Sequence, residues 1–434
     1  MDSGSEGEGH RALRHGPKRG RGARDLRVIR DAALLCRNGK VVASGSIQEV
    51  ERLATGGSAT EPLAKRTAET TGTTSPLQVI DAKGRVVSPG FVDAHTHLVF
   101  ADWRAAEYGM RAEGHSYLDI AAAGGGIRST VEATREASFQ ELCYRSLGFL
   151  DQMLMLGTTS LEAKSGYGLD CETEIKQLRV AAHCDEKHPV DVVSTFLGAH
   201  SIPIETDRQR FISQVIGMLP MVKGLDLARF VDVFCDEGAF TVEESRRILL
   251  AAREFGFGLK IHADELKWTG ATELACELGA VSCDHLIKVS EQGIRELAES
   301  NTVAVLLPAT SVFLGECRGA PGRALLDAGA AVAIGTDFNP GTSTAMSMSL
   351  CMTLACSTLR LSPEEAFTAA TWNAAWASGL GGKAGGLFPG LQADAVIFDA
   401  DDYREVAYRF GTSLVDTVIK GGKVVVRDGK LMYR

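Results

Sequence analysis

Two histidines separated by a single residue, His95 and His97, are the clearest chemical signal in the sequence. They lie in a short apolar run, residues 91–98, of the kind that forms a β-strand. Alternate side chains of a strand lie on the same side with their bases roughly 6–7 Å apart. Two imidazoles at that spacing can converge on one metal ion. The pair therefore predicts a metal site rather than two structural histidines.

Three later apolar runs end in side chains of the same chemical kind. They are Lys260-Ile-His262-Ala-Asp-Glu265, Cys283-Asp-His285 and Ile334-Gly-Thr-Asp337-Phe-Asn339-Pro-Gly341. Each is weak alone, because a single aspartate after a strand often caps a helix and a single barrel histidine is often structural. The carboxyl ends of the strands of one barrel meet at one face, so together these groups predict one cluster.

The strands needed to position these groups are visible as eight short apolar runs that alternate with helical segments of about ten residues or more. The runs span residues 91–98, 158–163, 192–199, 231–235, 259–263, 281–285, 303–308 and 332–336. The segments between them are amphipathic, for example 242–255 and 291–300, and begin after a Ser or Thr that can cap a helix. Eight strand–helix repeats predict an α/β fold, a (β/α)8 TIM-like barrel.

A second, smaller domain is expected from both ends of the chain. Residues 32–45 form two short apolar runs joined by Asn38-Gly39, a strong hairpin signal. Strand-like runs return after the barrel, at 393–398, 417–420 and 423–427. We therefore expect a small β-sandwich domain from residues 32–89 and 388–434, a barrel from 90–387, and a basic, disordered tail over residues 1–31.

Composition limits the partners of the chain. The 434 residues carry a net charge of -9, although residues 11–30 hold eight Lys or Arg against one acidic residue. The rest of the chain is therefore acidic, and we expect no nucleic-acid partner. Uninterrupted apolar runs stay short of the roughly 18 residues of a membrane span, so we expect no membrane partner. Ten cysteines without a Cys-x-x-Cys pair, and no export signal, favour the cytoplasm. A homodimer is left open.

The motifs resemble those of a known family. The stretch Pro-Gly-Phe-Val-Asp-Ala-His-Thr-His at residues 89–97 is similar to the opening motif of the amidohydrolase superfamily. Within it, the chain most resembles the imidazolonepropionase family of histidine degradation. The supporting motifs are Glu162-Ala-Lys-Ser-Gly-Tyr-Gly-Leu169, Leu197-Gly-Ala-His200, Asp232-Val-Phe-Cys-Asp236 and His262-Ala-Asp-Glu265. The resemblance runs from about residue 32 to the end of the chain.

The resemblance implies a role for each site residue. The implied ligands of a single zinc or iron ion are His95, His97, His262 and Asp337, a set that also suits Zn²⁺ or Fe²⁺ on chemical grounds. The candidates for proton transfer are Glu265, His285 and Asp337, with the base left open. The implied substrate contacts are Arg104, Tyr167, His200, Glu265, Asn339, Gly341 and Thr342. Tyr167 is expected to be exposed into the pocket. For Lys164, a solvated or ion-paired lysine and a functional role both stay open.

The implied activity is that of a metal-dependent cyclic amidase. It would open the ring of the small-molecule substrate 4-imidazolone-5-propanoate to give N-formimidoyl-L-glutamate. An aminohydrolase that releases ammonia from a purine or pyrimidine-like heterocycle would use a similar set of His, Asp and Glu side chains, and stays open as an alternative. A catalytically inactive barrel that acts as a scaffold is the alternative of another class.

Overall fold

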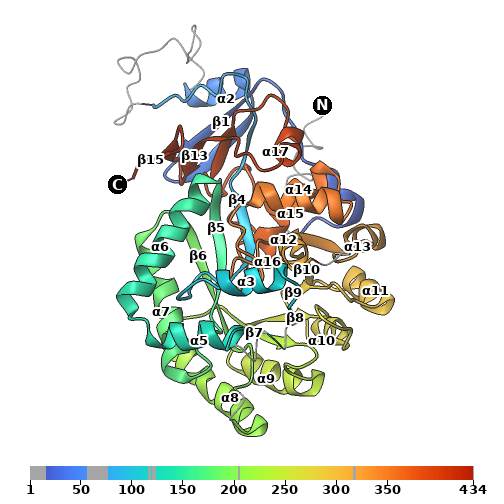
Figure 1. Ribbon diagram of the computed structural model, residues 1–434. Helices are drawn as coiled ribbons and strands as arrows, with labels where there is room; N and C mark the ends of the chain where they lie inside the picture. The colour runs from blue at the N-terminus through green and yellow to red at the C-terminus, as the bar shows by residue number, and fades with distance from the viewer. Residues whose placement is uncertain are drawn as a thin grey trace.

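The computed structural model describes residues 16–55, 77–115, 119, 124–203, 206–315 and 319–433. A parallel sheet of eight strands forms the body of the molecule, and each strand pairs with its neighbours in chain order (Figure 1). The strands are β4 (Phe91–Thr96), β5 (Thr158–Lys164), β6 (Asp191–Ala199), β7 (Phe230–Cys235), β8 (Gly258–Ala263), β9 (Ser282–His285), β10 (Val303–Leu306) and β11 (Ala331–Ile334). The predicted TIM-like barrel is confirmed.

The barrel closes where its first and last strands end. The Asp337 amide donates to the His95 carbonyl, and the His97 amide donates to the Phe338 carbonyl, both at 2.9 Å. The buried carboxylate of Asp93 accepts from the amide and hydroxyl of Thr336 at 2.9 and 2.6 Å. The seam between β4 and β11 is therefore made by residues next to, or among, the predicted metal ligands.

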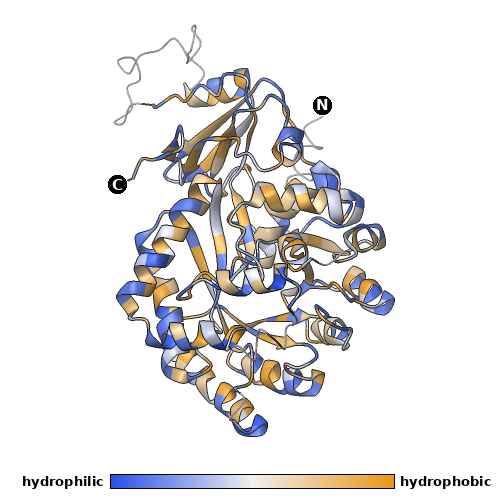
Figure 2. Cartoon of the chain, in the orientation of Figure 1, coloured by the Kyte–Doolittle hydropathy of each residue, from blue (hydrophilic) through white to orange (hydrophobic). Residues whose placement is uncertain are grey.

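Helices surround the barrel, and most of them turn an apolar face inward, whereas α3 has no buried residue (Figures 1 and 2). Those between β4 and β10 are α3 (Ala105–Ala112), α5 (Ile127–Glu136), α6 (Phe139–Met155), α7 (Cys171–Lys187), α8 (Arg208–Gly224), α9 (Val242–Glu254), α10 (Ala271–Glu277) and α11 (Glu291–Glu299). Those after β10 are α12 (Pro308–Phe313), α13 (Gly322–Ala328), α14 (Met348–Thr358), α15 (Pro363–Ala370) and α16 (Trp372–Ala377). The predicted caps are present: Thr241 and Glu244 form a capping box at α9, and Ser290 caps α11. No helix in the described part of the chain is long and apolar enough to cross a membrane.

A smaller β region is assembled from both ends of the chain. One antiparallel sheet joins β3 (Val87–Pro89) to β12 (Ala395–Phe398), β13 (Val415–Lys420), β14 (Lys423–Arg427) and β15 (Lys430–Leu431). The predicted hairpin is present as β1 (Ala32–Arg37) and β2 (Lys40–Ser46), and Asn38 and Gly39 both have the positive φ that its tight turn requires. The short helices α2 (Ile47–Ala54) and α17 (Arg404–Tyr408) complete this region.

The expectation of an unstructured tail over residues 1–31 is wrong for the part that the structure describes; residues 1–15 lie outside it. The 3-10 helix η1 (Gly20–Arg24) packs against the barrel, and Ala23 is buried. The Arg19 guanidinium donates to the carbonyls of Ala298 and Ser300, which close the C-terminus of α11. A cation is favourable there, because carbonyls at a helix C-terminus lack partners within the helix. Arg19 therefore holds this segment against the barrel instead of pointing into solvent.

Candidate metal centre and active site

The four predicted metal ligands come together at the carboxyl ends of β4, β8 and β11. Asp337 Oδ1 lies 3.5 Å from both His95 Nε2 and His97 Nε2. The ring centroid of His262 lies 4.6 Å from that of His95 and 5.6 Å from that of His97. All four side chains are buried. Residues far apart in the sequence thus present their donor atoms to one small volume.

The chemistry of these donors fits a divalent metal ion. His95 Nδ1 donates to Asp284 Oδ2 at 2.6 Å, and His262 Nδ1 donates to Asp232 Oδ1 at 3.1 Å. These bonds leave Nε2 of both rings unprotonated, and both Nε2 atoms are buried with no hydrogen-bond partner among the described residues. Burial lowers the pKa of His95, His97 and His262 well below the ordinary value, so the rings are neutral, as metal ligation requires.

Asp337 is held by its surroundings in an unusual state. Burial raises the pKa of its carboxyl to about 7, while Thr310 Oγ1 donates to its Oδ2 at 2.7 Å. Its φ of 52° lies in the left-handed region, as does the φ of 76° at His285. Such backbone conformations are costly for residues other than glycine and are often found at functional sites.

His285 and Glu265 lie beside the metal-ligand cluster. The ring of His285 is 5.4 Å from that of His95 between centroids, and its Nδ1 is 3.5 Å from Glu265 Oε1. Burial lowers the pKa of His285 to about 4, so the ring is neutral at pH 7. The Asp236 carboxylate holds the loop after β8, since it accepts from the Glu265 and Leu266 amides at 2.7 and 2.9 Å.

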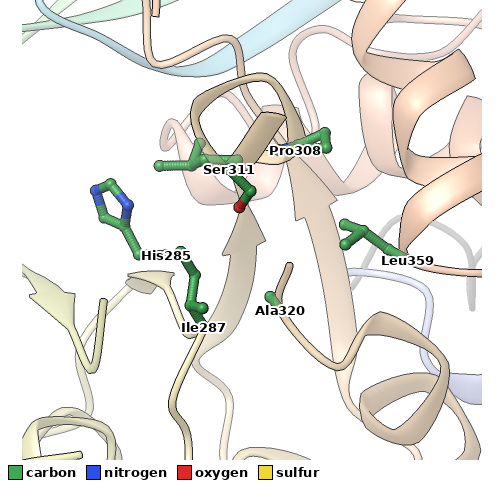
Figure 3. A pocket seen from close by; sticks show the side chains of 7 residues that line it. His285, Ile287, Pro308, Ser311, Ala320 and Leu359 are labelled. Carbon is green, nitrogen blue, oxygen red and sulfur yellow. The ribbon is translucent and has the colours of Figure 1, made fainter. Parts of the chain in front are cut away.

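A small pocket opens on the other side of His285 (Figure 3). It lies between the end of β9 and the start of α12. The remaining lining residues are Ile287, Leu307, Pro308, Ser311, Ala320 and Leu359. The mostly apolar lining next to His285 limits the water that can reach this side of the cluster.

Tyr167 and His200 pack against His97 of the cluster. Their ring centroids lie 5.6 and 5.0 Å from that of His97, and the His200 ring is stacked on it. The Tyr167 loop is fixed by Glu174 of α7, whose carboxylate accepts from the Gly168 amide at 2.8 Å. Burial raises the pKa of Tyr167, so the phenol keeps its proton and can donate. The ring is 3% exposed, so its predicted exposure is wrong in this conformation, although it does face the cluster.

Arg104 lies directly over Gly341. A Cβ atom at position 341 would come within 1.0 Å of Arg104 Nη2, so only glycine leaves room for this guanidinium. Arg104 Nε is buried, lies 3.7 Å from Glu107 Oε2 and has no hydrogen bond among the described residues. A second guanidinium, that of Arg111, donates to the Gly341 carbonyl at 2.8 Å. Two positive groups therefore lie side by side near the turn that follows Asp337.

Asn339 is bonded mainly within this turn. Its Oδ1 accepts from the amides of Gly341 and Thr342, both at 2.8 Å, and its Nδ2 donates to Thr342 Oγ1 at 2.8 Å. These bonds shape the turn that carries Gly341 and Thr342 under Arg104. Direct contact of Asn339 with a substrate stays a prediction.

The sequence reading missed the carboxylates behind the histidines. Asp232 and Asp284, which orient His262 and His95, are fully buried within β7 and β9. Of the possibilities left open for Lys164, the ion-paired side chain is present, and it is 1% exposed. The sequence does contain one signal for these contacts: Asp232, Asp284 and Lys164 are charged residues within apolar strand runs. Buried charges require partners, so these residues can be expected to pair with one another or with other polar groups.

Comparisons with known proteins agree with this geometry. The profile of the Amidohydrolase family matches residues 86–425. The chain is 45% identical to an imidazolonepropionase of Geobacillus sp. (strain WCH70) over 94% of its own length and 93% of that protein's. It is 47% identical to an imidazolonepropionase of Geobacillus kaustophilus (strain HTA426), again over 94% and 93%. The chain belongs to the imidazolonepropionase family of amidohydrolases.

Solved structures of other amidohydrolases share the fold. A 5-methylcytosine deaminase from Klebsiella pneumoniae superimposes with a TM-score of 0.68 at 17% identity, over 94% of this chain and 97% of that one. An adenosine deaminase from Xanthomonas campestris, solved with bound zinc, gives a TM-score of 0.63 at 19% identity over 93% and 90% of the two chains. At these identities the likeness establishes the barrel architecture alone.

Proposed function

We propose that the protein is a metal-dependent cyclic amidase that hydrolyses 4-imidazolone-5-propanoate to N-formimidoyl-L-glutamate. The observation that carries this proposal is the position of Arg104 and Tyr167 beside a buried cluster of three histidines and one aspartate. The 45% and 47% identity to imidazolonepropionases over 94% of the chain supports the same choice of substrate. Amidohydrolases that release ammonia are related to this chain at the level of the fold.

We assign His95, His97, His262 and Asp337 as ligands of one zinc or iron ion. When bound, such an ion lowers the pKa of a water molecule toward neutrality and polarises a carbonyl group. Two further carboxylates at the barrel centre, those of Glu162 and Asp284, could in principle hold a second ion. The Lys164 ammonium already lies between them, 2.9 Å from Glu162 and 3.4 Å from Asp284. This cation opposes a second metal ion and favours a single one.

The other residues bind the substrate and move protons. Arg104 is suited to the propionate carboxylate, which matches the two-pronged geometry of a guanidinium. Tyr167, His200, Gly341, Thr342 and Asn339 would surround the ring. Hydrolysis breaks the ring carbon–nitrogen bond, turns the carbonyl carbon into a carboxylate and places one proton on the leaving nitrogen. Glu265, His285 and Asp337 are the candidates to take the proton from water, and Glu265 Oε1 lies 3.5 Å from His285 Nδ1.

A location in the cytoplasm fits the thiols. All nine cysteines within the described ranges are free, as is usual in a reducing compartment.

Mass spectrometry of freshly made 4-imidazolone-5-propanoate, incubated with the purified protein, tests the function. We expect a product one water heavier, formed only without a chelator. If a folded, metal-loaded sample released ammonia from amino-substituted heterocycles and left the imidazolone intact, the protein would be an aminohydrolase. If it took up no metal after supplementation, it would be an inactive scaffold.

Replacing Arg104 by methionine is expected to raise KM about 100-fold with little change in kcat. The lost contact is a charged hydrogen-bonded pair in a site with little water, and such pairs contribute about 1.5–3 kcal/mol. Steady-state kinetics with the propionate substrate and with an uncharged ethyl analogue measures the effect. Wild type and Arg104→Met should have similar KM values for the uncharged analogue. Arg128→Met, which removes an exposed arginine paired with Glu132, should have the KM of wild type for both compounds. An unchanged KM in Arg104→Met would contradict the assignment.

A further inference from the structure

Lys164, the last residue of β5, is a buried cation that takes no part in the proposed substrate binding or proton transfer. Its Nζ lies 2.7 Å from Asp232 Oδ2, 2.9 Å from Glu162 Oε1 and 3.4 Å from Asp284 Oδ2. The side chains of all four residues are inaccessible to solvent. Burial alone would lower the pKa of Lys164, but the three carboxylates outweigh it and raise the pKa, so the ammonium keeps its charge.

Two of these carboxylates also accept hydrogen bonds from the assigned metal-ligand histidines. Asp232 uses one oxygen for Lys164 and the other for His262 Nδ1, at 3.1 Å. Asp284 Oδ2 accepts from His95 Nδ1 at 2.6 Å and lies next to the same ammonium. One lysine on β5 therefore connects, through carboxylates on β7 and β9, to imidazoles on β8 and β4.

We propose that Lys164 is a positioning residue of the metal centre: it holds Asp232 and Asp284 in place, and these fix the ring orientation and tautomer of His262 and His95. The proposal rests on the proposed function, because it takes those histidines as metal ligands. Without the Lys164 ammonium, Asp232 and Asp284 would lose the ion-pair partner that they share, because the other buried ammonium nearby, that of Lys260, contacts Glu162 instead. One of the two carboxylates would then be free to rotate away from its histidine. A histidine that loses its aspartate no longer has its Nδ1 hydrogen and its ring orientation fixed, and its Nε2 would cease to be reliably free and directed at the metal.

Lys260 of β8 provides a matched control. It is equally buried, and its Nζ lies 3.1 Å from Glu162 Oε1 and 5.2 Å from the centre of the Phe230 ring. Its ammonium contacts Glu162 rather than either histidine-bound aspartate. Lys260→Met therefore removes the same charge from the same interior without breaking the connection to His95 and His262.

Zinc affinity of the purified full-length protein, measured by competition with a chromophoric chelator, tests the proposal. We expect Lys164→Met to raise the zinc dissociation constant about 10–100-fold, the range typical of lost hydrogen-bond partners behind metal ligands. The visible spectrum of the Co²⁺-substituted protein should also change, because the ligand geometry changes. Lys260→Met should leave the dissociation constant within about 3-fold of wild type and the Co²⁺ spectrum unaltered.

A double variant that keeps the net charge covers the case in which Lys164→Met does not fold. Lys164→Met combined with Glu162→Gln removes one cation and one anion together, and Glu162→Gln alone is its control. We expect the double variant to bind zinc at least about 10-fold more weakly than Glu162→Gln. Equal affinities in these two proteins, or an equal loss in Lys260→Met, would overturn the proposal.

The outcomes separate this proposal from the function on which it rests. A wild-type protein that binds no stoichiometric zinc or iron would overturn both. A wild-type protein that binds zinc and opens the imidazolone ring, together with a Lys164→Met variant of unchanged zinc affinity, would overturn the role of Lys164 alone.

Discussion

Asp337→Ala is expected to reduce kcat/KM for ring opening by more than about 10³-fold, because the change removes a metal ligand and a candidate base together. Loss of one preorganised hydrogen-bond donor at an active site already costs about 10²–10³-fold. Asp337 Oδ1 lies 3.5 Å from Nε2 of both His95 and His97, so its removal opens one whole side of the ligand set. Metal analysis and steady-state kinetics on the same preparation measure the two losses.

A milder change at the same carboxylate is the control. Thr310→Val removes the 2.7 Å hydrogen bond to Asp337 Oδ2 but keeps the ligand, and we expect kcat/KM to fall by about 10-fold or less.

The pH dependence of metal binding gives a further check on Asp337. Because burial raises the pKa of Asp337 to about 7, protons compete with the metal for this carboxylate, and metal affinity should fall as the pH drops below about 7. Full metal occupancy and activity in Asp337→Ala would show that the ligand set is wrongly assigned.

Glu265→Gln is expected to lower kcat by about 10²–10⁴-fold, the usual contribution of a general acid or base, with metal content unchanged. The amide has the same shape as the carboxyl group but cannot carry a proton between water and the leaving nitrogen. The backbone contacts of Glu265 with Asp236 are unaffected, so the loop should keep its position. Stopped-flow or steady-state turnover, together with metal analysis, separates a proton-transfer defect from loss of the metal.

Glu237→Gln is the matched control for this prediction. Glu237 is an exposed glutamate that pairs with Lys267 at 2.6 Å, and its replacement should change kcat by less than about 2-fold. A Glu265→Gln variant with nearly wild-type kcat would exclude Glu265 from proton transfer and leave His285 and Asp337 as candidates.

The barrel could be predicted from the sequence because each strand is a short apolar run and each helix has a periodic apolar face. The metal-ligand set could be predicted because His95, His97, His262 and Asp337 all stand at the carboxyl ends of such runs. One architecture brings those ends together, so the position of each residue along its strand was enough. Both inferences depend on local pattern and on a topology with few alternatives.

Contacts between distant residues could not be predicted in the same way. Arg19 looked like part of a solvated basic arm, since nothing nearby in the sequence reveals the helix end at Ala298 that accepts its hydrogen bonds. Lys164 has its partners on three different strands, and only the folded barrel places them together. For Asn339, the sequence showed a polar residue after a metal ligand but not the two amides that its side chain accepts from.

The seam between β4 and β11 links closure of the barrel to assembly of the predicted ligand set. The amides and carbonyls that close it belong to His95, His97, Asp337 and Phe338, so closure of the barrel brings Asp337 to the two histidines of β4. A chain still on the ribosome exposes His95 and His97 early, but it lacks the carboxylate until residue 337 has been made and β11 has reached β4. A fragment that ends just before residue 337 would retain the three histidines but lack both the carboxylate and the seam that fixes His95 and His97 beside it.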